Sequence, residues 1–158
     1  MRLWHYRTIS FLPTLQLLGQ WRECCSIASR WAAEGTPRHI LVNPVLHYPI
    51  EDFMIFCKIV YDTMIERGYK PQEYCVARLK DHIAMIYLYD AKDIPVIRDT
   101  IDDLWNYSYN PKEIVIFEHW HNDEYLTINY WNMREKYLCG GIPEPEWQRY
   151  LEGGRELV

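Results

Sequence analysis

Few residues of this chain are of the kinds that make flexible, fibrous or membrane-spanning proteins. Only seven of its 158 residues are glycine, and it has no serine-rich tract or internal repeat, which excludes collagen-like and low-complexity classes. The longest apolar run near the N-terminus, residues 11–18, is interrupted by Pro13, Thr14 and Gln16 and precedes no small-residue cleavage site, so it is a poor signal peptide. We expect a cytoplasmic protein that starts at Met1 and has no membrane partner.

Cysteines are also few, and their pattern does not suggest a bound metal. The five cysteines include the adjacent pair Cys24 and Cys25, and no two of them have the C-x-x-C spacing of zinc or redox sites. This cysteine usage fits a reducing cytoplasm. The sequence also lacks G-x-S-x-G, a phosphate-binding glycine loop and H-E-x-x-H. We therefore expect neither a cofactor nor a metal.

Aromatic residues are plentiful, with seven Trp, thirteen Tyr and four Phe, and the length suits one domain with a substantial core. The net charge of −5 argues against a polyanionic partner. However, residues 1–50 hold five arginines and two glutamates, a balance of +3, whereas residues 71–158 hold nine basic and sixteen acidic groups, a balance of −7. This asymmetry allows a basic face on an acidic protein.

The clearest periodic segment runs from Thr14 to Ala33, after Pro13 and before Gly35, which predicts a helix. Its apolar residues share one face, expected to be buried: Leu17, Leu18, Trp21, Cys24, Cys25, Ala28, Trp31 and Ala32. Its polar residues share another face, expected to be exposed: Gln16, Gln20, Glu23 and Arg30.

The remaining segments predict a mostly α, single-domain fold over residues 1–158. We expect an extended connector over 36–50, with at most a short strand at 40–42, and then a helix over 50–67. The apolar stripe of that helix is Phe53, Phe56, Cys57, Val60 and Met64. A helix over 73–89 follows, although its part at 83–89 is alternatively a strand, and another helix covers 97–105. The last expected elements are a β-like run at 114–117, a helix capped at Asn122 and running to 137, and a short helix over 146–152.

Two groups of residues have the composition of reactive sites. Glu118, His119, His121, Asp123 and Glu124 are metal-type ligands, but H-x-H needs a further ligand that the sequence does not identify, and a polar turn with a helix N-cap explains the cluster equally simply. Cys24 and Cys25 lie on the apolar face of the first helix, where a thiol is usually inert.

The opening MRLWHYRTISFLPTLQLLGQWRECC and the ERGYK at residues 66–70 resemble the pyrimidine-dimer DNA glycosylase family, the bacterial and phage relatives of phage endonuclease V. The chain is similar in particular to an uncharacterised bacterial branch with an MRLWH start, an LLGQxRECC helix (residues 17–25) and a late HNDEYL segment (residues 121–126). The resemblance is good over residues 1–70, patchy over 114–142 and absent over 71–110.

This resemblance implies an all-α fold in which the N-terminal α-amine lies against the first long helix. The amine attacks C1′ of a flipped-out deoxyribonucleotide to form an imine, and β-elimination then cleaves the strand. The family's Arg and catalytic Glu fall on Arg22 and Glu23. Arg2, Gln16, Gln20, Arg22 and Arg30 are then the expected contacts to damaged duplex DNA.

An α-amine suits this chemistry because its ordinary pKa lies near 8, about two units below that of lysine, so part of it is neutral at pH 7. Family members lose Met and expose a small residue, whereas Arg2 is large and removal of Met before Arg is not expected. Either the Met1 amine takes the role or the site is inactive.

Three functional hypotheses follow. The first is a DNA glycosylase with abasic-site lyase activity that uses Met1 and Glu23. The second is a non-catalytic nucleic-acid-binding or protein-interaction module on the same fold, and the third is a metal-dependent hydrolase centred on His119 and His121. An N-terminus within reach of Glu23 favours the first hypothesis, an N-terminus pointing to solvent favours the second, and a bound metal favours the third.

Overall fold

The chain is helical throughout the part for which the computed structural model describes the backbone, residues 1–88 and 94–157; side chains are described there except at 94–98. The elements are η1 (Tyr6–Phe11), α1 (Thr14–Glu34), η2 (Asn43–His47), α2 (Ile50–Glu66), α3 (Glu73–Leu88), α4 (Ile94–Trp105), α5 (Asp123–Leu138) and α6 (Glu144–Arg155), where η denotes a short 3-10 helix. Neither described range contains a strand. The predicted all-α fold is confirmed.

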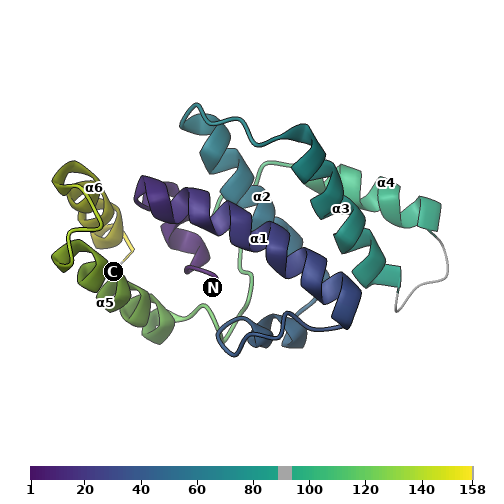
Figure 1. Cartoon of the computed structure of the whole chain (residues 1–158), viewed down its shortest axis with the longest axis horizontal. Coiled ribbons are helices and arrows are strands. Elements are labelled where there is room, and N and C mark those ends of the chain that lie inside the picture. The colour runs from purple at the N-terminus through teal and green to yellow at the C-terminus, as the bar shows by residue number, and fades with distance from the viewer. Residues whose placement is uncertain (89–93, 158) are drawn as a thin grey trace.

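Helix α1 crosses the middle of the molecule, with α3 and α4 on one side and α5 and α6 on the other (Figure 1). It begins after Pro13 and ends at Gly35, whose left-handed φ of 77° favours glycine, as the sequence predicts. The predicted apolar face is buried except at Leu18 and Cys25, which are only partly buried. No helix in the described residues is long and apolar enough to cross a membrane.

The other helix predictions are largely confirmed. The apolar stripe predicted for α2 is buried, and α3 stays helical to Leu88, so the alternative of a strand over residues 83–88 is wrong; residue 89 lies outside the described residues. Asn122 caps α5 as predicted, because its side chain accepts the backbone N–H of Tyr125. Helices α4 and α6 are longer than predicted.

Both predicted strands are wrong, because backbone groups that a neighbouring strand would bind form hydrogen bonds with other partners. At residues 40–42 the chain turns instead, and the carbonyl of His39 accepts the N–H groups of Val42 and Asn43. At residues 114–117 the carbonyl of Ile114 accepts the Tyr6 hydroxyl at 3.0 Å. Phe117 adopts a left-handed φ of 51°, and its N–H donates to Asp52 Oδ2 at 2.9 Å.

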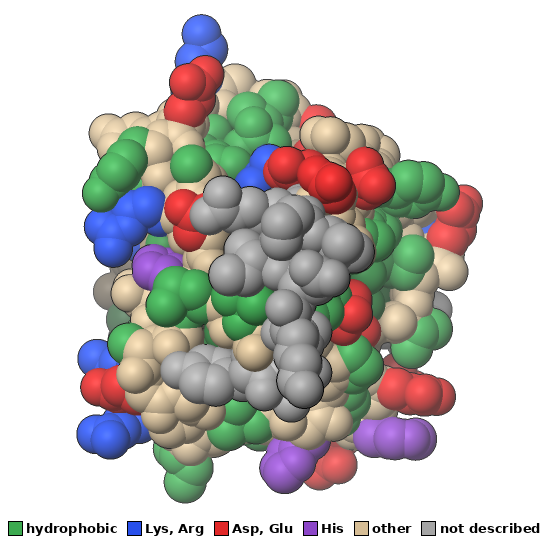
Figure 2. Space-filling view, turned by 90° about the vertical axis from the view of Figure 1, so that its right-hand side faces the viewer, with side chains coloured by type: hydrophobic (Ala, Val, Ile, Leu, Met, Phe, Trp, Pro, Cys, Tyr) green, Lys and Arg blue, Asp and Glu red, His purple; other side chains and the backbone are tan. Residues whose placement is uncertain are grey.

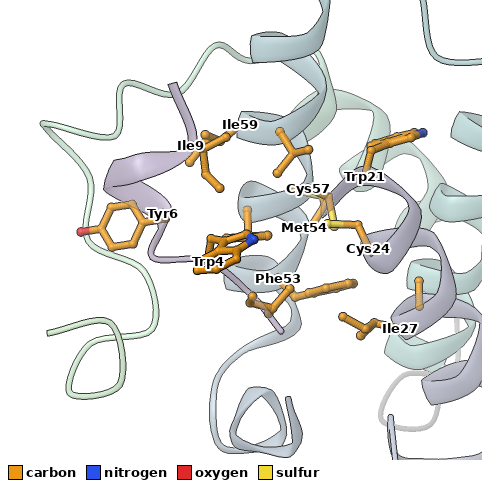
Figure 3. Packing of buried hydrophobic residues seen from close by; sticks show 14 of the residues in the cluster. Trp4, Tyr6, Ile9, Trp21, Cys24, Ile27, Phe53, Met54, Cys57 and Ile59 are labelled. Carbon is orange, nitrogen blue, oxygen red and sulfur yellow. The ribbon is translucent and has the colours of Figure 1, made fainter. Parts of the chain in front are cut away.

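One cluster of buried apolar side chains includes residues from all of the helices. Trp4, which precedes the first helix, is 4% exposed and points into this cluster toward Phe53 and Met54 (Figure 3). On the end of the molecule that carries α3 and α4, charges of both signs are present (Figure 2).

The close packing of α6 on η1 generates a test of the fold. Gly153 lies against the Phe11 ring, so that a methyl group added there would overlap the ring, whereas a methyl group at Gly154 meets nothing within 4 Å. We expect Gly153→Ala to lower the free energy of unfolding by about 1–3 kcal/mol through overpacking. The matched Gly154→Ala should leave it unchanged or raise it by up to about 1 kcal/mol through helix propensity. Urea unfolding of both variants measures the difference, and equal stabilities would contradict this packing.

Candidate active site

The first residues of the chain run along α1, and they bring the N-terminal amine to a carboxylate. The Met1 nitrogen lies 3.8 Å from Glu23 Oε1. The backbone N–H of Arg2 donates to the other carboxylate oxygen of Glu23 at 3.4 Å. The side chains of Met1 and Glu23 keep 22% and 31% of their surface exposed, so this pair is open to a ligand.

Gln20 fixes the same segment one turn earlier on α1. Its Oε1 accepts the N–H of Trp4 at 2.8 Å, and its Nε2 donates to the carbonyl of Arg2 at 3.1 Å. The Nε2 group also lies 3.4 Å from Glu23 Oε2. The prediction that Gln20 lies on the exposed face is therefore wrong: it is 1% exposed, because the N-terminal segment covers it.

Side chains of α5 and of the turn before it hold the other side of this segment. The hydroxyl of Tyr125 donates to the carbonyl of Leu3 at 2.5 Å, and the N–H of His5 donates to Asn129 Oδ1 at 2.8 Å. The N–H of Tyr6 donates to His121 Nδ1 at 3.1 Å. The predicted site residues include neither Tyr125 nor Asn129, although Tyr125 belongs to the HNDEYL segment that the resemblance singles out.

Two imidazoles are buried here, that of His5 within the segment and that of His121 beside it, and both are neutral. Burial lowers the pKa of His5 to about 4, and burial lowers the pKa of His121 well below its ordinary value. The Nδ1 atom of each ring accepts a backbone N–H, from Arg7 and Tyr6 respectively, which assigns the proton to Nε2 in both rings. His5 Nε2 then donates to the carbonyl of His121 at 2.9 Å.

The histidine and carboxylate cluster proposed as a metal site is arranged differently. His121 Nδ1 is occupied by the Tyr6 N–H, and its Nε2 is buried. His119 is exposed on a turn with a left-handed φ of 50°. Within residues 1–88 and 94–157 no three His, Cys, Asp or Glu side chains are grouped as metal ligands. The ring of His121 therefore accepts a hydrogen bond from the backbone of the N-terminal segment.

The remaining predicted contacts lie along α1 and beside its start. The guanidinium of Arg2 stacks on the Trp4 ring at 4.9 Å. Arg22 is exposed next to Glu23, and Gln16 has a buried side-chain oxygen that accepts no hydrogen bond from the described residues. Arg30, two turns beyond Arg22, borders an open groove of about 470 Å³ between α1 and α3.

Arg78 and His82 of α3 line this groove opposite Arg30, together with Glu34 of α1. Burial lowers the pKa of His82, so Arg78 is the cation that α3 contributes. Neither Arg78 nor His82 was among the predicted contacts, because no local pattern connects α3 with α1. The thiols nearby are poor nucleophiles, as expected from their place on the apolar face. Burial raises the pKa of Cys25 to about 12, and burial raises the pKa of Cys24, which faces Cys57 in the core (Figure 3).

Comparison with known proteins agrees with the resemblance seen in the sequence. A family model described as pyrimidine dimer DNA glycosylase matches residues 1–77, just under half of the chain. The matched part contains the N-terminal segment, α1 with Glu23, and α2. No curated protein and no solved structure matches the chain. That residues 78–158 belong to the same family domain stays a prediction.

The neutral imidazoles predict how the stability of this region depends on pH. His5 binds protons less readily in the folded chain than in the unfolded chain, whose histidine pKa is about 6.5, so stability falls as the pH drops from about 6.5 through 4. For His5 alone this loss is about 3 kcal/mol. We expect His5→Gln, which does not titrate, to show a shallower decline, measured by urea unfolding at pH 7, 5.5 and 4. Parallel declines in both proteins would contradict a buried neutral His5.

Proposed function

We propose that this protein is a DNA glycosylase with abasic-site lyase activity on damaged pyrimidines, and that the Met1 amine is its nucleophile. The observation that carries the proposal is the 3.8 Å approach of the Met1 nitrogen to Glu23 Oε1. Imine formation at a sugar carbon requires a nucleophilic amine, and a neighbouring carboxylate can stabilise the cationic imine. The match of residues 1–77 to the pyrimidine dimer DNA glycosylase family supports the same reaction.

The first step forms a covalent bond between protein and sugar. The lone pair of the neutral Met1 amine attacks C1′, the bond from C1′ to the base nitrogen breaks, and the departing base takes that electron pair and a proton. The nitrogen then passes one proton to O4′ as the C1′–O4′ bond breaks, so the ring opens and O4′ becomes a hydroxyl. The lone pair left on the nitrogen forms the double bond to C1′, which gives a cationic imine between C1′ and Met1. The carboxylate of Glu23 stabilises this positive charge electrostatically and relays protons.

The second step cleaves the strand. A proton leaves C2′, the electron pair forms the C2′–C3′ double bond, and the C3′–O bond breaks with the phosphate as leaving group. Water then adds to C1′ and releases the Met1 amine, so the protein is regenerated without a cofactor. Glu23 is the proposed proton acceptor, because it is the carboxylate that contacts the amine.

Basic residues near this pair are proposed to hold the DNA backbone. Arg22 and Arg30 are exposed on α1, eight residues or about 12 Å apart along the helix, and Arg2 lies beside Glu23. Planar guanidinium groups bind phosphate in a fixed geometry. The groove that Arg30 shares with Arg78 continues this basic track from α1 to α3. Gln16, a partly exposed residue one turn before Gln20 on α1, is proposed to contact the lesion.

The imine gives a direct test, because borohydride reduces it to a stable bond between protein and DNA. We expect wild-type protein to form such an adduct with duplex DNA that contains an abasic site. A peptide tag that precedes Met1 should abolish the adduct, whereas the same tag after Val158 should not, since only the first removes the free Met1 amine. The adduct is measured by gel shift under denaturing conditions. Binding of DNA without any adduct would instead support a non-catalytic module, and equal adducts from both tagged proteins would disprove the role of Met1.

A second test separates catalysis from binding. Glu23→Gln keeps the shape of the side chain but removes its charge, so we expect cleavage to fall by about 10² to 10³ while DNA binding is retained or improved. Glu135→Gln, at an exposed carboxylate of α5 outside this groove, is the matched control and should cleave normally. Arg22→Ala should weaken binding and reduce its salt dependence by about one phosphate contact. Single-turnover cleavage and affinity titrations measure these effects, and wild-type cleavage by Glu23→Gln would refute the assignment.

A further inference from the structure

Six backbone groups of residues 2–6 are bound by side chains from distant parts of the chain. Its groups and their partners are Arg2 N–H with Glu23, Arg2 carbonyl with Gln20, Leu3 carbonyl with Tyr125, Trp4 N–H with Gln20, His5 N–H with Asn129 and Tyr6 N–H with His121. A segment that precedes the first helix is usually the least ordered part of a chain. Here it is fixed between α1 and α5.

Half of these contacts come from outside the matched family region. Tyr125 and Asn129 belong to α5, and both lie beyond residue 77, where the family match ends. They are one helical turn apart, and Asn129 Nδ2 donates to the carbonyl of Tyr125 at 2.8 Å, which orients the amide so that its oxygen faces His5. Asn129 is fully buried, so its polar group has no solvent to bind.

The contact of Tyr125 is the one nearest to the amine. Its hydroxyl holds the carbonyl of Leu3, two residues after Met1, while Gln20 holds the carbonyl of Arg2 from the opposite side. Burial raises the pKa of Tyr125, so its hydroxyl keeps the proton that it donates. Displacement of Leu3 therefore moves Met1 relative to Glu23, since only Arg2 lies between Met1 and the fixed carbonyl.

We propose that Tyr125 and Asn129 of α5 are positioning residues, which together with Gln20 place the Met1 amine against Glu23. This inference rests on the proposed function for its catalytic consequence. It assigns a purpose to the HNDEYL segment, in which Asn122 starts the helix, His121 holds Tyr6 and Tyr125 holds Leu3. The second half of the chain then completes a site whose reacting groups are all in the first half.

The test compares two substitutions that each remove one hydroxyl from α5. Tyr125→Phe keeps the ring but loses the bond to Leu3, and Tyr137→Phe loses a surface bond to Glu144, far from the N-terminus in sequence. Gln20→Met removes the opposing contact from α1 without touching α5. We measure hydrogen exchange of the peptide covering residues 1–11, DNA affinity, and the single-turnover rate of borohydride trapping on abasic duplex DNA.

We expect Tyr125→Phe and Gln20→Met to speed exchange in residues 1–11 and to lower the trapping rate about 10- to 100-fold, as a misplaced reactive group does. Their DNA affinities should stay within about twofold of wild type, because Gln20 is buried beneath the N-terminal segment and the Tyr125 hydroxyl is bound to Leu3, so neither group is free to contact DNA. Tyr137→Phe should match wild type in all three measurements. A merely structural role for Tyr125 predicts faster exchange with an unchanged trapping rate, and that result would overturn the inference.

The outcomes also separate this inference from the proposed function. If wild-type protein forms no adduct, the proposed function fails, and hydrogen exchange alone decides whether α5 holds the segment. Unchanged exchange in Tyr125→Phe relative to Tyr137→Phe would then overturn the inference. If wild type forms the adduct and Tyr125→Phe traps at the same rate, the function stands and the positioning role is refuted.

Discussion

The structure depends on hydrogen-bond partners for the backbone of residues 2–6, which pair with no strand among the described residues. Ordering each residue of such a segment costs about 1–2 kcal/mol, and each buried polar group left unpaired costs about 1–3 kcal/mol more. Five backbone groups of residues 2–6 avoid the second cost because Gln20, Tyr125, Asn129 and His121 supply their partners. Those partners come from both halves of the sequence, namely from α1 and from α5 with the turn before it.

Apolar burial supplies the free energy that these hydrogen bonds do not. Leu3 and Trp4 are buried in the core, and burial of one large side chain contributes about 1.5–3 kcal/mol. Packing of these two side chains brings the polar backbone between them within reach of Gln20 and Tyr125. The contacts that stabilise the fold are thus the same contacts that leave the Met1 amine beside Glu23.

Helices that depend on neighbouring residues could be predicted from the sequence, whereas contacts between segments far apart in the chain could not. Helices α1, α2 and α5 follow from apolar period, Pro13 and the Asn122 cap, which act within a few residues. The predicted strand at residues 114–117 fails because Tyr6, more than 100 residues earlier, takes the Ile114 carbonyl. The helical pattern places Gln20 and Glu23 on one face, but it does not reveal that the N-terminus covers that face. The pairing of Met1 with Glu23 came from the family resemblance, since neither residue is distinctive alone.

The binding of a polyanion at such a site depends on the local charge and not on the net charge of −5. At physiological ionic strength the Debye length is about 8 Å, so carboxylates on the far helices act weakly on a phosphate bound near Glu23. Arg22 precedes Glu23 in the chain, and the backbone N–H of Arg2 donates to Glu23, whereas Arg30 and Arg78 line a groove between α1 and α3. In the proposed function, affinity for DNA therefore comes from the phosphates that reach the arginines of α1, and the acidic groups of residues 71–158 weaken it only slightly.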